Sequence, residues 1–358
     1  VVDAGDRDPG EVAAAVAAEY KARKFDYENE WPLRMAVITH HGNATHVAPM
    51  ICHIALDAFG LAVLYDDFDQ RDERTGPVTA MQPMEQASWQ RGPSGRRAHE
   101  ASMRYFERLA ASVPDRQFKP SADPRQPRFW QVTLDSPAGY RAAGMLAARL
   151  GLGTSPVLLA AFAVALASVS VSRRVAAYLV VSNRFRRGFA DSVSPVMQAS
   201  LGVIETDGPF EEVVRRAWKS GLGAYKHAYY DPAGMSEVYK RVAAERGTEP
   251  DWSVVFNDRR VLSREFADTV SAADGAPSLR DELTRSTLTW GDRNDMPQQK
   301  VFLNICDAPD TLCCEMWADT NFVSPADMEG LLSRIETVVV NAALADGAPA
   351  ARASTQNP

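Results

Sequence analysis

A proline-dense segment divides the chain and is the feature that most limits how it can fold. Between residues 113 and 130 the sequence contains Pro114, Pro120, Pro124 and Pro127. Because proline fixes φ and removes a backbone donor, no regular helix or central strand is expected to cross this stretch. Strand and helix patterns occur on both sides. We therefore predict an α/β protein with domains at 1–125 and 126–344 and a flexible tail at 345–358.

Composition excludes several classes of protein. The chain has 358 residues, 46% of them hydrophobic, with a formal net charge of −7. This charge argues against nucleic acid or an anionic membrane as the partner, and the longest apolar run, residues 157–167, is too short to span a bilayer. The sequence has no nucleophile elbow, no phosphate-binding loop and no basic, apolar leader. We expect a cytoplasmic monomer.

The cysteine content gives no sign of a metal site. The spacing of the cysteines suits neither a disulfide framework nor a zinc site, so no metal is expected. We interpret all of them as buried small hydrophobic side chains. They are Cys52, Cys306, Cys313 and Cys314.

A histidine at the end of a predicted strand is the first candidate for chemistry. Residues 33–40 and 46–53 alternate like the two strands of a hairpin, with Gly42 and Asn43 as turn residues. The second strand ends at His53, and Asp57 follows where a helix begins. Imidazole suits proton acceptance near neutral pH. From spacing alone two alternatives stay open: His53 as a hydrogen-bonded core residue and Asp57 as a helix N-cap.

Two rival arrangements near His53 are weaker. His40, His41 and His46 flank the predicted turn, and adjacent strand residues point to opposite faces, so a solvated hairpin tip is favoured over a metal site. The same alternation separates Cys52 from His53, which argues against a Cys-His dyad.

The segment Cys52-His53-Ile54-Ala55-Leu56-Asp57-Ala58 resembles the His-His-x-x-x-Asp-Gly motif of a known family. That family is the condensation domains of nonribosomal peptide synthesis, within the chloramphenicol-acetyltransferase-like superfamily. The likeness runs from about residue 25 to 342 and suggests a free-standing actinobacterial member of natural-product or antibiotic biosynthesis. It includes the segments 31–38, 59–65, 82–90, 181–195 and 256–258, and the strand around Trp290.

The resemblance implies a fold and a reaction. The fold would be two lobes of sheet and helices forming a V with a central tunnel, the early part of the first lobe being absent here. The donor would be an acyl or aminoacyl thioester on the phosphopantetheine arm of an acyl or peptidyl carrier protein. A small-molecule amine or alcohol would attack it, giving an amide or ester, with no bound cofactor.

The resemblance also implies roles for residues. His53 would be the general base or would position the attacking atom. Asp57 would be structural, paired with an arginine for which Arg34 and Arg184 are the alternatives. The residues expected to line the tunnel or bind substrate are Cys52, Ala58, Gly60, Asn257 and Trp290.

Two departures from the family motif leave alternative functions open. Cys52 replaces the first histidine and Ala58 replaces the glycine. One alternative is a catalytically silent domain that recruits carrier proteins or tailoring enzymes. Another is an acyltransferase of the same fold that uses coenzyme A thioesters.

Overall fold

The computed structural model describes residues 1–70, 79–262 and 278–345, which separate into two compact units. The first unit contains Val1–Gly92 and Ser182–Met197, and the second contains Pro93–Val181 and Gln198–Pro358. The segment 182–197 thus belongs to the first unit, although the residues directly before and after it belong to the second.

The predicted boundary at residue 125 does not match this division, because residues 93–125 lie in the second unit. The cause is packing. Helix α4 (Pro93–Ala110) buries Tyr105 and Phe106 in a hydrophobic cluster with Met235 and Val238 of helix α8 (Pro232–Arg246). The prolines mark an irregular connection, but the helix before them packs with elements that follow. Of the predicted tail, Ala345 ends a helix, and 346–358 lie outside the described residues.

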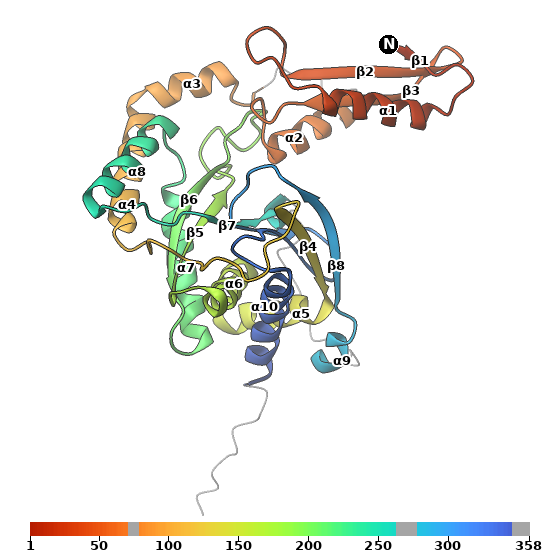
Figure 1. Cartoon of the computed structure of the whole chain (residues 1–358). Helices are drawn as coiled ribbons and strands as arrows, with labels where there is room; N and C mark the ends of the chain where they lie inside the picture. The colour runs from red at the N-terminus through yellow and green to blue at the C-terminus, as the bar shows by residue number, and fades with distance from the viewer. Residues whose placement is uncertain (71–78, 263–277, 346–358) are drawn as a thin grey trace, which may run out of the picture. The chain divides into compact units, whose positions relative to one another are not determined.

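The first unit contains a three-stranded sheet in the order β1-β2-β3 (Figure 1). Its strands are β1 (Val2–Asp3), β2 (Leu33–His40) and β3 (Asn43–Ile51). The predicted hairpin is confirmed, but the centre of its turn is His41 (φ 51°) and Gly42 (φ 80°), because Asn43, predicted to lie in the turn, is the first residue of β3. Positive φ at both positions gives the turn the twist that antiparallel strands prefer.

One helix packs on this small sheet. Helix α1 (Pro9–Ala22), capped by Asp8, buries Val12 against Ala36 and Ile38. Alternate residues of the two long strands face the other way, where Met35 and Val47 are exposed. Helices α2 (Ala58–Asp69) and α3 (Pro83–Arg91) complete the unit.

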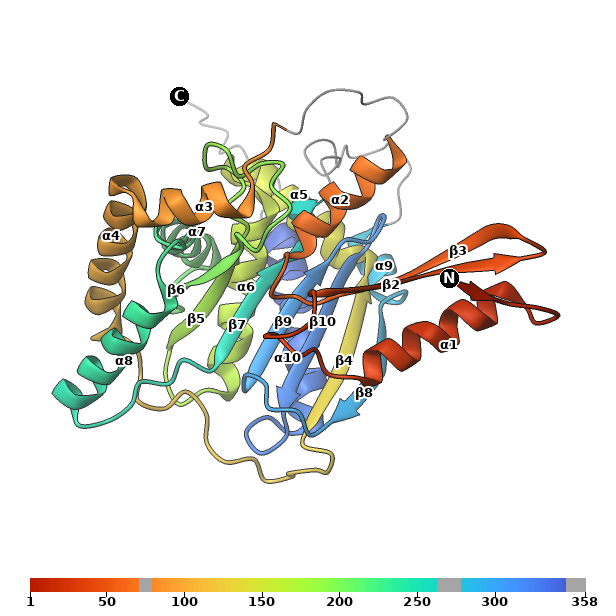
Figure 2. The same cartoon turned by 90° about the horizontal axis from the view of Figure 1, so that it is seen from above.

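The second unit is built on a seven-stranded mixed sheet in the order β6-β5-β7-β9-β10-β4-β8 (Figure 2). Strand β5 is parallel to β7 and β7 to β9, while the remaining neighbours are antiparallel. The strands are β4 (Phe129–Ser136), β5 (Arg174–Val181), β6 (Gln198–Glu205), β7 (Val254–Asp258), β8 (Thr287–Asn294), β9 (Val301–Cys306) and β10 (Leu312–Asp319).

Helices cover the two faces of this sheet unequally. The main core lies on one face, under α5 (Pro137–Leu150), α6 (Thr154–Val169), α7 (Phe210–Lys226) and α10 (Pro325–Ala345). On the other face α4 and α8 lie side by side and cover the β5–β6 edge (Figures 1 and 2). The short helices η1 (Arg259–Leu262) and α9 (Leu279–Leu283) complete the unit.

The helix starts follow the sequence closely. Ser136 caps α5 by accepting the amide of Gly139, and Pro137 occupies the first turn, an arrangement that a Ser-Pro pair favours. In the described ranges no single helix is long and apolar enough to cross a membrane. Helices α5 and α6 would meet the length and composition criteria as a pair, but they bend by 114° at their junction.

Candidate active site

Asp57 is a buried carboxylate that accepts several hydrogen bonds. It is 2% exposed, and as N-cap of α2 its Oδ1 accepts the amide of Gly60 at 2.8 Å. Its Oδ2 accepts the amides of Val196 at 3.0 Å and Met197 at 2.9 Å. The predicted N-cap is therefore present, and the same carboxylate also holds the end of the 182–197 segment.

Arg184 is the arginine partner of Asp57. Its Nη2 donates to Asp57 Oδ1 at 2.6 Å, and both side chains are less than one-tenth exposed. Its Nη1 donates to the carbonyls of Phe189, Ala190 and Ser192. A buried ion pair needs such additional bonds to offset desolvation. The pair thus fixes the start of α2 to a loop more than a hundred residues later.

Arg34, the alternative partner, has a different role. Its guanidinium donates to Glu30 Oε1 at 2.5 Å and to the carbonyls of Tyr20, Arg23 and Lys24. These carbonyls lie at the end of α1 and just beyond it, where helices leave acceptors unsatisfied. Arg34 therefore ties α1 to β2, and the prediction that it supports Asp57 is wrong.

His53 lies on a turn between β3 and α2, and its side chain is exposed. One end of the turn is anchored by the Cys52 amide, which donates to the Pro32 carbonyl at 2.9 Å. The other end is anchored by Asp57. The alternative of a buried core histidine is thereby removed, and the imidazole is presented from a backbone fixed on both sides.

A small cavity of about 280 Å³ opens beside His53. Its wall is mostly apolar, which suits the carbon chain of a substrate, while His53 and Tyr65 supply polar atoms. The residues that line it are Pro49, Met50, Ile51, His53, Leu56, Asp57, Ala58, Leu61 and Tyr65. Ala58, predicted to line the tunnel or bind substrate, is among the residues of this cavity.

Gly60 and Cys52 do not line this cavity. Gly60 is buried at the start of α2, and a Cβ there would come within 3.3 Å of Arg184 Nη2, Leu56 Cβ and the Ser194 amide. Its role is close packing around the Asp57–Arg184 pair. Cys52 is half-buried, so the prediction that its side chain is buried is wrong.

The two predicted substrate residues of the second unit lie on opposite faces of its sheet. Trp290 packs against the main core, and its Nε1 donates to Glu329 of α10 at 3.0 Å. Asn257 alternates with Val254 and Phe256, which belong to that core, so its side chain faces the other way and donates to Asn304 Oδ1 at 2.9 Å. Trp290 therefore supports the core.

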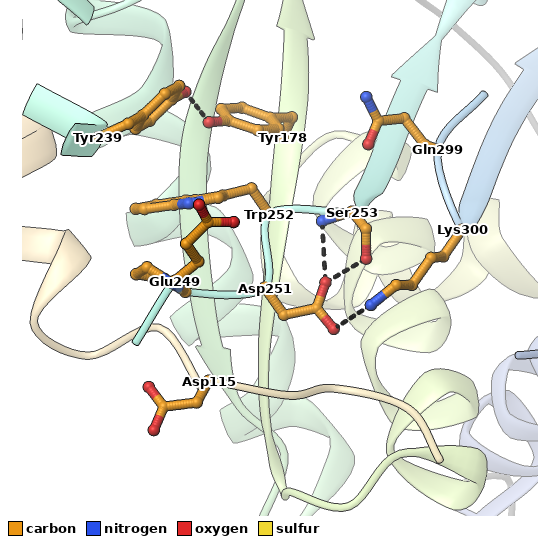
Figure 3. Close-up of a pocket in the computed structure, with 10 residues that line it drawn as sticks. Asp115, Tyr178, Tyr239, Glu249, Asp251, Trp252, Ser253, Gln299 and Lys300 are labelled. Carbon is orange, nitrogen blue, oxygen red and sulfur yellow. Dashed lines mark hydrogen bonds and ion pairs between the residues drawn. The ribbon is translucent and has the colours of Figure 1, made fainter. Parts of the chain in front are cut away.

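A wider pocket of about 580 Å³ lies in the second unit (Figure 3). Rings of Tyr178, Tyr239 and Trp252 gather in one part of it, and Asp251 with Lys300 in another. Its polar side chains mostly bond to one another: the two tyrosine hydroxyls pair, and Asp251 accepts from Lys300 at 2.8 Å. Asp115, Glu249 and Gln299 also line the pocket and bond to none of these side chains. We favour the smaller cavity because it holds the imidazole of His53, the candidate proton acceptor.

Sequence reasoning missed several parts of the site. Val196 and Met197 bind Asp57 through their backbone amides, which every residue except proline has, so the sequence could not predict these bonds. Tyr65 could have been found, because Ala58, Leu61 and Tyr65 share one face of α2 at helical spacing. Among the described residues no group of three histidine, cysteine or acidic side chains is placed to hold a metal ion.

Comparisons with known proteins identify the fold. Neither family models nor curated proteins gave a match. Solved structures did. One of them is a structure that concerns condensation domain-mediated chain release from the enacyloxin polyketide synthase. It matches with a TM-score of 0.68 at 19% identity, over 98% of this chain and 67% of that chain.

Two further matches agree with this. The cyclization-docking bidomain of the EpoB nonribosomal peptide synthetase from Sorangium cellulosum gives a TM-score of 0.62 at 19% identity, over 96% of this chain and 69% of that chain. The first condensation domain of the calcium-dependent antibiotic synthetase gives a TM-score of 0.59 at 15% identity, over 96% of this chain and 74% of that chain. The chain therefore has the α/β fold of the condensation domains, and identities this low establish the fold alone.

Proposed function

We propose that this chain, which has the condensation-domain fold, is a condensation enzyme. It would join an acyl or aminoacyl group, carried as a thioester on the phosphopantetheine arm of a carrier protein, to an amine or alcohol acceptor. The observation that carries the proposal is the placement of His53: exposed, on a turn anchored at both ends, beside an apolar cavity.

The proposed reaction requires the protein to position the two reactants and to supply one proton acceptor. The acceptor nitrogen or oxygen attacks the thioester carbonyl carbon while His53 takes or holds the proton of the attacking atom. The tetrahedral centre then collapses, the carbon–sulfur bond breaks and the thiol of the arm leaves with a proton. Holding the two reactants beside His53 replaces a bimolecular encounter with an oriented one.

Asp57 and Arg184 act indirectly in this proposal. Neither is an acid or base in the reaction, since both are buried and bonded to each other and to the backbone. Their function is to keep the turn of His53 in place. A site fixed by a neighbouring network can hold a reacting group to within fractions of an ångström.

A recruitment platform is the second candidate, because two motif positions depart from the family pattern. Cys52 stands in place of the first histidine and Ala58 in place of the glycine. In this reading the chain binds a loaded carrier protein and presents it to another enzyme without turning it over.

A thioester panel separates the candidates. The protein is mixed with acyl and aminoacyl thioesters on N-acetylcysteamine, on coenzyme A and on carrier proteins, each with and without amine and alcohol acceptors, and thiol release is followed. The enzyme reading predicts acceptor-dependent thiol release, fastest from a loaded carrier. Carrier binding without thiol release would support the platform, and release from coenzyme A alone would support the small-molecule acyltransferase.

A further inference from the structure

Two cysteines of the second unit face each other across neighbouring strands. Cys306 ends β9 and lies directly opposite Cys313 of the antiparallel strand β10. Both are half-buried and carry free thiols. The next residue, Cys314, points to the other face of the sheet, where it is fully buried in the main core. The interpretation as buried side chains is therefore wrong for Cys306 and Cys313 and confirmed for Cys314.

Backbone geometry brings this pair within bonding range. Directly opposed residues of antiparallel strands have Cα atoms about 4.5–5.5 Å apart, within the range of about 4.4–6.8 Å that a disulfide spans. The two side chains project from the same face because they are opposed in register. A short connection, residues 307–311, joins the two strands next to the pair.

The surroundings make the two thiols chemically unequal. A hydrogen bond from Cys313 lowers the pKa of Cys306 to about 7, helped by the nearby Arg259 and opposed by burial and by Glu315. The same bond raises the pKa of Cys313 above its usual value, and burial and Asp135 on the adjacent strand β4 act in the same direction. One member of the pair is thus a nucleophile near neutral pH, and the other stays a thiol.

We propose that Cys306 and Cys313 form a redox-active dithiol that a hydroperoxide converts into a disulfide between β9 and β10. The Cys306 thiolate attacks the peroxide, breaks the O–O bond and becomes a sulfenic acid, and the hydroxide that leaves takes a proton to give water. The Cys313 sulfur then displaces the sulfenic hydroxyl, its proton leaving with that oxygen as a second water. Two thiols are oxidised by two electrons and one hydroperoxide is reduced.

Peptide mapping of the full chain tests this directly. Cleavage before aspartate cuts at Asp307 and Asp310 and so separates Cys306 from Cys313. After one equivalent of hydrogen peroxide and blocking of free thiols, we expect a linked peptide pair, two hydrogens lighter than the sum of its parts, that dithiothreitol separates. Fragmentation of the linked pair assigns the bond to Cys313 or to its neighbour Cys314.

Cysteine variants and the pH dependence of alkylation provide two further tests. C306A should abolish the linked pair, whereas C314A should retain it; if C314A does not fold, the fragmentation data make the assignment. In the reduced protein, alkylation of Cys306 by iodoacetamide should rise about tenfold between pH 6 and 8, as the thiolate fraction of a group with a pKa of about 7 requires. Oxidation of Cys306 to sulfinic acid without a linked pair, or a pair that joins Cys306 to Cys314 or Cys52, would overturn the proposal.

Discussion

Arg184 donates to Asp57 at 2.6 Å, although the two residues are 127 positions apart in the sequence, and neither side chain is exposed by more than 9%. This contact connects the N-terminus of α2 to the segment 182–197, which also binds Asp57 through two backbone amides. The turn that carries His53 ends at this carboxylate. The candidate site therefore depends on a long-range ion pair that takes no part in the chemistry.

Replacing Asp57 by asparagine should destabilise the first unit strongly. The substitution keeps the size of the side chain but leaves the buried guanidinium of Arg184 without its counter-charge. Breaking one partner of a buried pair costs about 3–5 kcal/mol of the free energy of unfolding, which urea denaturation can measure. E237Q is the matched control, since the side chains of the Lys240–Glu237 pair are about 70% exposed. The change in the free energy of unfolding when this pair is lost should be near the limit of detection. Equal stabilities for the two variants would contradict this role of Asp57.

Gly60 and Gly221 should respond in opposite directions to alanine. At Gly60 the new methyl group meets three atoms at 3.3 Å around Arg184 and Leu56, and overpacking of this kind costs about 1–3 kcal/mol. Gly221 lies within α7 with nothing within 4 Å of the added carbon, so alanine should stabilise by about 0.5–1 kcal/mol through helix propensity. Thermal melting of both variants checks the prediction, which fails if G60A is as stable as the parent protein.

The Asp251–Lys300 pair predicts how stability depends on acid. Burial raises the pKa of Asp251, but bonds from Lys300, Ser253 and the Gln117 amide outweigh it and hold the pKa below its usual value. A lowered pKa in the folded state gives stability that is present above the unfolded value of about 3.9 and is lost as the pH falls further.

D251N removes this contribution. At neutral pH the variant should be less stable by about 3 kcal/mol, because Lys300 is left unpaired. Between about pH 6 and about pH 3 the free energy of unfolding of the parent protein should fall more steeply than that of D251N. Parallel stability curves would show that the carboxylate does not act in this way.

Replacing Trp290 by phenylalanine should affect stability and leave acyl transfer unchanged. The ring packs on the helix-covered face of the sheet, and its Nε1 donates to Glu329. Loss of that hydrogen bond costs about 1 kcal/mol. Because the side chain supports the core, the KM values for donor and acceptor should stay constant, and a selective rise in either would restore Trp290 as a substrate residue.

Local features of the fold were predictable because their causes lie within a few residues. The Asp57 and Ser136 caps follow from short-range hydrogen bonding, and the hairpin follows from alternation and turn chemistry, although its turn lies at His41 and Gly42, one residue before the predicted position. His53 was predicted to end the second strand, but β3 ends at Ile51 and His53 lies on the turn that follows.

Features that depend on distant partners were not predictable from the sequence pattern. Arg34 and Arg184 are both arginines near apolar strands, and only the folded chain shows which one reaches Asp57. The face to which Trp290 points is set by the pairing of β8 with β4, more than 150 residues away. The packing of α4 with α8 likewise overrode the boundary suggested by the prolines.

The central claim is that His53 carries the acyl transfer, and one comparison tests it most directly. Thiol release is measured for the parent protein, H53A and H46A, with a donor and acceptor that the parent protein turns over. His46 is an exposed histidine of the same unit, on β3, and serves as the matched control. H53A should lose about 10²–10⁴-fold in kcat while keeping the parent melting temperature, and H46A should match the parent in both. Thiol release by a folded H53A at the parent rate would contradict the account.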